Sequence, residues 1–498
     1  MERFRLPTHC VHSSWVRSCL TDGGAMNLGR RWKLQTKLSC ALLAGLSAQL
    51  AQAQRPAADV EARELFATLV SFRSSAGQGQ VAPMAAYIVK RLGAAGVATG
   101  DIAELSVGDA KALVVRVPGS DPKARAVLFS GHMDVVDARP EDWERDPFKL
   151  VEENGFYFAR GATDNKAGIT AMVTTIIRLR GEGLKLKRTL LFAFVGDEET
   201  EMKTTELIAS HPWVRGAELA INTDAGNGIL SEDGKPLIYQ IQGAEKTYAT
   251  FEVAASNPGG HSSKPRADNA IFDLAEAIAR IRAHRFPVQS NGITRSYLAA
   301  AGRTTPGKLG EALTRFAANP ADTEAANSLA ADPEYVGTTR TTCIPTRLSG
   351  GHADNALPQT AVATINCRIL PGTAKAEVQQ TLTEVVANPR LSVRLSDGSP
   401  ESPVSEMRPD VLRAVTGWMN RHYPGVPIAT YMESGATDGL VYRAAGIPTY
   451  ASSGIFRRNS DNFEHGLNER IPIKSFFESI DHIYSLAVEL GGAKRQKQ

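Results

Sequence analysis

The sequence predicts an α/β fold, in which a mostly parallel sheet carries helices on both faces and a smaller α+β domain is inserted into the chain. From residue 58 onward, short apolar runs alternate with segments of helical periodicity, an order typical of parallel sheets. Between residues 243 and 398 the order changes to β-α-β-β-α-β, which is typical of a ferredoxin-like domain. We therefore expect one domain made of residues 54–242 and 399–498, and a second made of residues 243–398.

Hydrophobic periodicity places the elements of the larger domain. A helix is expected over 61–72, where Leu65, Leu69 and Phe72 recur on one side, and another from Lys166 to Arg180. A last helix is expected over 473–490, with Gly491 as its cap. The expected strands are the apolar runs 112–117, 125–130, 189–195 and 218–222.

The inserted domain has its own pattern. Its first strand alternates polar and apolar residues around 243–255, and a long polar, Ala-rich stretch at 286–336 interrupts the domain and is expected to form extra helices. The remaining expected elements are a helix at 267–284, strands at 338–349 and 360–370, and a helix at 374–388.

Composition excludes several classes of function. The 498 residues contain 56 basic and 53 acidic side chains, and the net charge of +3 argues against a nucleic-acid binder. The apolar runs are all shorter than the roughly 18 to 20 residues that span a bilayer, so the mature chain is not expected to bind a membrane. At roughly 100 to 200 residues per domain, two or three domains are expected.

Residues 1–53 read as a leader followed by a secretory signal peptide. Basic residues from Arg30 precede a short apolar stretch, which ends in Ala51-Gln52-Ala53 before Gln54. A membrane anchor or a buried helix is the alternative, and translation could begin at Met1 or at Met26. The signal predicts export to the periplasm or the medium, with cleavage after Ala53.

Two cysteines, Cys343 and Cys367, remain in the mature chain. If residues 350–360 form the loop of a hairpin centred on Asn355, each cysteine lies twelve residues from that centre, so the two should face one another. An oxidising compartment permits a disulfide, and two buried thiols are the alternative.

Imidazole and carboxylate side chains follow the expected strands. Taken singly, each of these residues can be explained without a functional role, as a surface histidine, a helix cap or part of a solvated acidic loop. Together they would meet at one edge of a parallel sheet, where zinc, cobalt or manganese could bind, and the excess of carboxylates suggests two ions bridged by one of them. The residues are His132 and Asp134, Asp164, Glu198 and Glu199, Asp224, and His465.

Several short motifs follow one another along the chain in a fixed order, namely GHMDVV, GFYFARGATDNKAG, GDEE, NTDAG, PGGHSS, SGATDG and EHGLNERI. These motifs and their order resemble those of the M20 metallopeptidases. The resemblance covers about residues 60 to 490, and the insertion and the TTCIPTRLSGG segment resemble the carboxypeptidase S-like and aminoacylase-like branch in particular.

The resemblance implies a role for each site residue. One metal ion would be held by His132, Asp164 and Asp224. The other would be held by Asp164, Glu199 and His465, with Asp164 as the bridge. The carboxylate of Asp134 would hydrogen-bond His132 and fix its tautomer, Glu198 would be the general base, and His261 of the inserted domain would stabilise the oxyanion.

The implied function is that of an exported di-metal (zinc) amide hydrolase, in which metal-activated water attacks small peptides or N-acyl amino acids. The inserted domain would be a lid or dimerisation domain, on a monomer or a homodimer. A free substrate carboxylate would be held by candidates Asn355, Arg368 and Gly435. The alternatives are a strict dipeptidase or aminopeptidase, which needs an acidic group for the free amine, and a non-catalytic binding protein, against which the complete ligand set argues.

Overall fold

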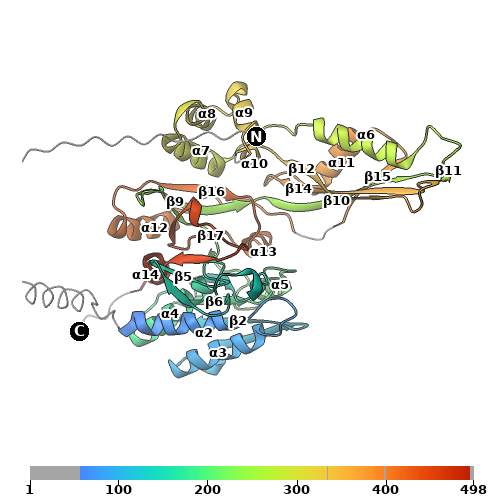
Figure 1. Cartoon of the computed structure of the whole chain (residues 1–498). Helices are drawn as coiled ribbons and strands as arrows, with labels where there is room; N and C mark the ends of the chain where they lie inside the picture. Colours follow the sequence, from blue (N-terminus) through green and yellow to red (C-terminus); the bar gives the residue numbers. More distant parts are fainter. Residues whose placement is uncertain (1–56, 334, 397–399, 494–498) are drawn as a thin grey trace, which may run out of the picture. The chain divides into compact units, whose positions relative to one another are not determined.

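The computed structural model describes residues 57–333, 335–396 and 400–493 (Figure 1). The predicted leader and signal peptide therefore lie outside the described residues. From Asp59 onward the chain forms one unit that contains a large sheet and a separate four-stranded sheet. Among the helices that the structure describes, none combines the length and apolar character needed to cross a bilayer.

The large sheet has the order β1-β2-β6-β3-β7-β17-β9-β8-β18, and β16 pairs with β9 outside this path. Its centre is parallel from β6 through β3 and β7 to β17, whereas β2 is antiparallel to β1 and β6, and β9 is antiparallel to β17 and β8. The predicted α/β class is therefore confirmed. The strands are β1 (Ile102–Val107), β2 (Ala110–Val117), β3 (Val127–His132), β6 (Leu190–Val195), β7 (Leu219–Asn222), β8 (Gly228–Leu230), β9 (Pro236–Glu245), β16 (Ile428–Glu433), β17 (Thr449–Ala451) and β18 (Phe456–Arg458).

Helices cover both faces of this sheet. In β6 all six residues are buried, with Phe192 in the core on one face and Leu191 and Ala193 in the core on the other. This explains why its sequence is a continuous apolar run rather than an alternating one. One face is covered by α2 (Ala57–Ser71), α3 (Val81–Ala94), α4 (Lys166–Gly181), α12 (Pro409–His422) and α14 (Ile473–Leu490), and the other by α5 (Lys203–Ser210) and α13 (Gly439–Ala444). A small sheet contains β4 (Val151–Glu153), β5 (Phe156–Phe158) and β19 (Arg470–Pro472).

The inserted segment forms the predicted β-α-β-β-α-β arrangement. Its antiparallel sheet has the order β12-β14-β10-β15, and alternate residues of β10 are buried, as expected for a sheet with helices on one face. The change of sheet falls between β9 and β10, at Lys246, and the exact domain boundaries stay a prediction. The elements are β10 (Thr247–Ser256), α6 (Ala270–Ala283), β12 (Thr342–Gly350), β14 (Thr360–Ile369), α11 (Lys375–Val386) and β15 (Leu391–Leu395), with the short pair β11 (Gly260–His261) and β13 (Ala356–Leu357).

The stretch 286–336 is helical, as predicted, but its first helix packs on the large sheet. Ile293 of α7 lies in one buried cluster with Ala244 and Met432, which belong to β9 and β16. Figure 1 shows α7 beside β16. The insertion therefore adds a wall to the larger domain. Its helices are α7 (Gly292–Thr304), α8 (Gly307–Ala318), α9 (Thr323–Ala330) and α10 (Val336–Thr339).

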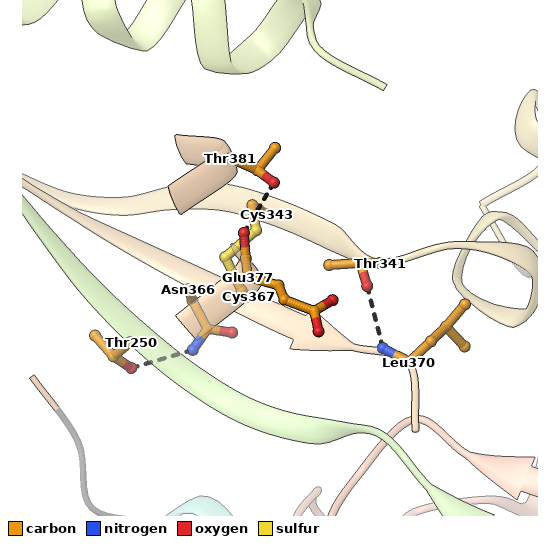
Figure 2. The surroundings of a disulfide bond; sticks show 8 residues. All are labelled: Thr250, Thr341, Cys343, Asn366, Cys367, Leu370, Glu377 and Thr381. Carbon is orange, nitrogen blue, oxygen red and sulfur yellow. Dashed lines mark hydrogen bonds between the residues drawn. A yellow bond between two sulfur atoms is a disulfide. The ribbon is translucent and has the colours of Figure 1, made fainter. Parts of the chain in front are cut away.

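Cys343 and Cys367 face one another, as the hairpin argument predicted, and they form a disulfide. They are a directly opposed pair in the register of β12 and β14, and Figure 2 shows the bond between these strands. The disulfide closes a segment of 24 residues at the edge of the four-stranded sheet. It thereby restricts the unfolded chain of the inserted domain.

The double variant Cys343→Ser/Cys367→Ser should lower the free energy of unfolding of the inserted domain by about 3 kcal/mol, because the 24-residue loop is no longer closed in the unfolded state. Urea unfolding followed by amide exchange in β12 and β14 measures the effect. Under a reducing agent the wild type should match the variant. An oxidised wild type that unfolds at the same urea concentration as the variant would contradict this expectation.

Candidate metal centre

Three neighbouring strands deliver the first group of site residues. His132 is the last residue of β3, Glu198 and Glu199 follow the end of β6, and Asp224 follows the end of β7. Because β6, β3 and β7 are parallel neighbours, their carboxyl ends lie at one edge of the sheet. This is the edge at which open α/β sheets bind ligands.

The loop that carries Asp164 is held by a single buried carboxylate. Glu469 accepts hydrogen bonds from the backbone N–H of Gly161 at 2.9 Å, of Thr163 at 2.8 Å and of Asp164 at 3.2 Å. It also accepts a bond from Arg160 Nη1 at 2.8 Å. Glu469 therefore positions Asp164. This role could not be predicted, because a charged residue in a loop gives no periodic signal of burial.

The carboxylate of Asp164 lies between the two imidazoles. His132 Nε2 is 2.8 Å from Asp164 Oδ1, and His465 Nε2 is 3.0 Å from Asp164 Oδ2. On the outer sides, His132 Nε2 is 3.2 Å from Asp224 Oδ1 and His465 Nε2 is 3.1 Å from Glu199 Oε2. The five side chains expected to hold metal are thus brought together around one central carboxylate.

Asp134 contacts His132 differently from the expected arrangement. The Nδ1 atom of His132 is 3.0 Å from the backbone oxygen of Asp134 and 3.6 Å from its carboxylate oxygen, which is beyond hydrogen-bond distance. The carboxylate instead accepts the backbone N–H of Glu198 at 3.2 Å and of Glu199 at 3.0 Å. A proton on Nδ1 of His132 would be shared with a carbonyl, which leaves the Nε2 lone pair facing the acidic residues.

The site electrostatics favour positive charge. Burial lowers the pKa of His132, but the charge of Asp224 and the neighbouring carboxylate contacts outweigh it and raise the pKa well above its ordinary value. Hydrogen bonds to Asp164 and Glu199 raise the pKa of His465 to about 10. Burial raises the pKa of Asp224 to about 6. Without a metal ion these side chains bind protons near neutral pH. A divalent cation that binds to them would displace those protons.

The donor set fits divalent metal ions. His132, Asp164 and Glu199 offer ligand atoms within 4.8 Å of one another, and so do His132, Glu198 and Asp224. Nitrogen and oxygen donors without a thiolate suit zinc, cobalt or manganese. The second group contains Glu198, so the geometry alone does not separate a ligand from a base between the two adjacent glutamates.

A cavity of about 630 Å³ opens beside the cluster and includes Asp164, Asp224, His465 and Gly435 in its lining. Glu433 lines it as well, and its carboxylate accepts bonds from the Ser434 N–H at 2.8 Å and the Tyr431 hydroxyl at 3.2 Å. No acidic group for a free amine could be predicted from the sequence, because Glu433 directly precedes the SGATDG motif without being part of it. Arg368 donates to the backbone oxygen of Ser434 at 3.3 Å, next to this lining.

His261 and Asn355 lie together, apart from this cavity. The N–H of Ser262 donates to the backbone oxygen of Asn355 at 3.0 Å, and β11, which contains His261, pairs with β13. Both side chains are exposed, and neither lines the cavity. Of the predicted substrate and lid residues, the structure thus brings Arg368 and Gly435 to the cavity but not His261 or Asn355.

His261→Ala should lower turnover by about a hundredfold with unchanged metal content, if the inserted domain closes to complete the site. Its removal would leave the oxyanion without that donor while the metal ligands remain in the other domain. Turnover and metal analysis measure the two effects, and His352→Ala is the control, since His352 is another exposed histidine of the same domain. Loss of metal from His261→Ala would make His261 a ligand and contradict the assignment.

Comparison with known proteins identifies the family. The model of peptidase family M20/M25/M40 matches residues 128–489, which include every residue of the cluster. The chain belongs to this family. The predicted family and enzyme class are confirmed, and the protein is a metal-dependent enzyme of the peptidase and amidohydrolase type.

Relatives by sequence include proteins named as a synthase/hydrolase and as a probable carboxypeptidase. The chain is 27% identical over 391 residues to N-fatty-acyl-amino acid synthase/hydrolase PM20D1 of Mus musculus, covering 74% of this chain and 75% of the relative. It is 26% identical over 390 residues to the probable carboxypeptidase S-like 2 of Dictyostelium discoideum, covering 75% and 73%. The fold matches that of the M20 family metallo-carboxypeptidase Sso-CP2 from Sulfolobus solfataricus, with a TM-score of 0.65, 19% identity, and coverage of 86% of this chain and 99% of that one.

Proposed function

We propose that this protein is an exported di-metal amide hydrolase that cleaves N-acyl amino acids or small peptides with a free carboxylate. The observation that carries the proposal is the Asp164 carboxylate, which lies between the Nε2 atoms of His132 and His465 at 2.8 and 3.0 Å. Two metal ions that share one bridging ligand need a carboxylate that belongs to both ligand sets. Asp164 meets this requirement, since each of its neighbouring ligand sets contains one imidazole. The hydrolase activity in the name of the mouse relative supports the substrate class.

The residues divide into two ligand sets. His132, Asp164 and Asp224 would hold one ion, and Asp164, Glu199 and His465 the other, with Zn²⁺ expected and Co²⁺ or Mn²⁺ as alternatives. When bound, such ions supply Lewis acidity toward the scissile carbonyl and lower the pKa of a nearby water. The carboxylate of Asp134 keeps the backbone after β6 in position through the two N–H groups that it accepts.

Glu198 is the proposed general base. Its side chain is buried beside the ligand group of His132 and Asp224, and burial raises its pKa well above the ordinary value. A carboxylate there can take a proton from the attacking water and deliver it to the leaving nitrogen. Arg368 supports a carboxylate site at the cavity edge, because its guanidinium donates to the backbone oxygen of Ser434, next to Gly435 of the lining. The N–H groups of Ser434 and Gly435 donate to Glu433, so Arg368 rather than these groups would pair with the substrate carboxylate. Asn355 would take part only after closure of the inserted domain.

A dipeptidase or aminopeptidase is the second candidate, and Glu433 favours it. Its carboxylate lines the same cavity, with one oxygen held by the Ser434 N–H, and it could pair with a free amine. Glu433→Gln should then weaken hydrolysis of substrates with a free amine and leave N-acyl substrates unaffected.

A parallel hydrolysis screen tests the proposal. The mature protein, loaded in turn with Zn²⁺, Co²⁺ and Mn²⁺, is assayed against N-acyl amino acids, the same acyl groups as amides without a carboxylate, and dipeptides. We expect N-acyl amino acids or dipeptides to be cleaved only in the presence of metal and only with the carboxylate present. Equal cleavage of the amides would contradict the carboxylate requirement, and no cleavage of any compound would contradict the function.

Export is tested on the secreted protein. The tripartite segment that ends in Ala51-Gln52-Ala53 supports cleavage before Gln54. Intact-mass analysis should find Gln54, open or cyclised, at the N-terminus of protein recovered outside the cytoplasm. A chain that keeps Met26 and stays in the cytoplasm would contradict export.

A further inference from the structure

One face of helix α7 lines the cavity of the metal cluster. Tyr297, Ala301 and Thr304 are spaced by four and three residues, so they share one side of the helix, and all three line the cavity that also contains Asp164 and Asp224. The helix belongs to the stretch 286–336, which interrupts the inserted domain. A segment outside the catalytic motifs therefore contributes directly to the substrate cavity.

This wall is fixed to the sheet that carries the metal residues. Near the start of α7, Ile293 is buried with Ala244 of β9, and near its end Ala300 is buried with Ile238 of the same strand. The hydroxyl of Ser296 accepts the N–H of Thr430 in β16 at 3.3 Å. The helix thus runs opposite to β9 and is packed on the larger domain.

The cavity extends well beyond the metal cluster along β9. Gln242 is level with Asn222, the last residue of β7, because both pair with Ala451 of β17. From Gln242 to Leu237 the strand continues for five residues, about 16 Å at the usual rise per residue. Leu237 lines the cavity, and since α7 runs opposite to β9, Thr304 lies toward this far end. A substrate group that starts at the metal cluster has room for an extended chain.

The chemistry of the lining changes along this path. Asp164 and Asp224 line the cavity at the metal cluster. Farther along, Ile229, Leu237 and Ile238 from β8 and β9 form an apolar strip with Ala301 of α7, which lies beside the polar Gln240 and Thr304 of the same lining. A charged or strongly hydrated substituent would lose its water against these apolar side chains, while an alkyl chain would gain from burial there. The volume of about 630 Å³ is within the range of ligand cavities.

We propose that the α7 face of Tyr297, Ala301 and Thr304 sets the length of the acyl group that the enzyme accepts, with an extended alkyl chain lying along β9 and its far end near Leu237 and Thr304. This inference rests on the proposed amide hydrolase function and specifies its substrate. The acyl carbonyl would lie at the metal cluster, and the amino-acid carboxylate would point toward the guanidinium of Arg368.

The test fills the far end of the cavity without changing the metal residues. Thr304 is exposed and lines the cavity, so Thr304→Trp adds bulk there without overpacking a core. The holoenzyme variant is assayed with N-acetyl and N-dodecanoyl derivatives of the same amino acid. We expect kcat/KM for the dodecanoyl substrate to fall by about tenfold or more, and that for the acetyl substrate to stay within about twofold.

Two further variants make the result specific. Arg303→Trp places the same side chain at the neighbouring exposed position, which does not line the cavity, and should leave both substrates unchanged. Leu237→Asn makes the far end polar and should also penalise only the long acyl chain. Equal losses for both substrates in Thr304→Trp, or no loss for the long one, would overturn the inference. A wild-type enzyme that cleaves dipeptides but no N-acyl amino acid of any length would also overturn the inference, whereas one that cleaves neither class would overturn the proposed function.

Discussion

Glu198→Gln should bind both metal ions and substrate but lose turnover by about a thousandfold or more. General acid–base catalysis contributes about a hundredfold to ten-thousandfold to the rate, and the variant would lose this contribution. Glutamine keeps the size and one carbonyl oxygen of the side chain, yet it cannot accept a proton at neutral pH. Glu198 is buried and lies within reach of His132 and Asp224, where a water attacking a substrate carbonyl would be. The step that fails is therefore proton transfer.

Glu199→Gln should behave differently, although the two residues are adjacent and chemically identical. His132 belongs to the ligand groups of both glutamates, but the Glu199 group also contains Asp164, whereas the Glu198 group also contains Asp224. In addition, Glu199 Oε2 is 3.1 Å from His465 Nε2. The two side chains thus reach opposite ends of the cluster. Glu199→Gln should lose one ion per chain. Metal analysis beside single-turnover rates measures both variants, and metal loss from Glu198→Gln with retention in Glu199→Gln would reverse the roles.

The elements that could be predicted are those whose signal is local. The helix at 473–490 was predicted with its observed bounds, because its apolar residues recur at helical spacing and Gly491 follows its end. The clustering of His132, Glu199 and Asp224 could be expected as well, since apolar runs without alternation indicate buried parallel strands, and such strands end at one edge. The opposition of Cys343 and Cys367 followed from counting residues to a turn.

The features that could not be predicted depend on contacts between distant segments. Glu469 holds the loop before Asp164 from about 300 residues away, and nothing in the local sequence of either segment indicates the pairing. The packing of α7 on β9 and β16 had no sequence signal, because an amphipathic helix does not specify which apolar surface it covers. The carboxylate of Asp134 accepts bonds from backbone N–H groups. The sequence could not predict this, because an aspartate can accept a bond from a backbone N–H or from an imidazole, and the residue type does not indicate which.

Asp164→Asn should have the largest effect on metal content, with loss of both ions and a fall in turnover of about a thousandfold or more. The two carboxylate oxygens lie 2.8 Å from His132 Nε2 and 3.0 Å from His465 Nε2, so each oxygen serves one half of the cluster. Asparagine fills the same space but removes the negative charge and one of the two oxygen acceptors. The positive charge of two close ions would then lack the group that separates and neutralises them.

The fold should survive this substitution, because Glu469 bonds to the backbone of the Asp164 loop and not to the Asp164 side chain. The matched control is Asp137→Asn, which removes an exposed carboxylate paired with Arg73 at 2.7 Å, five residues beyond His132, and should keep both ions. Metal stoichiometry by mass spectrometry, circular dichroism and turnover are measured on both variants. One ion retained by Asp164→Asn would mean that a terminal ligand set can bind without the bridge, and two ions retained would show that Asp164 does not bridge them.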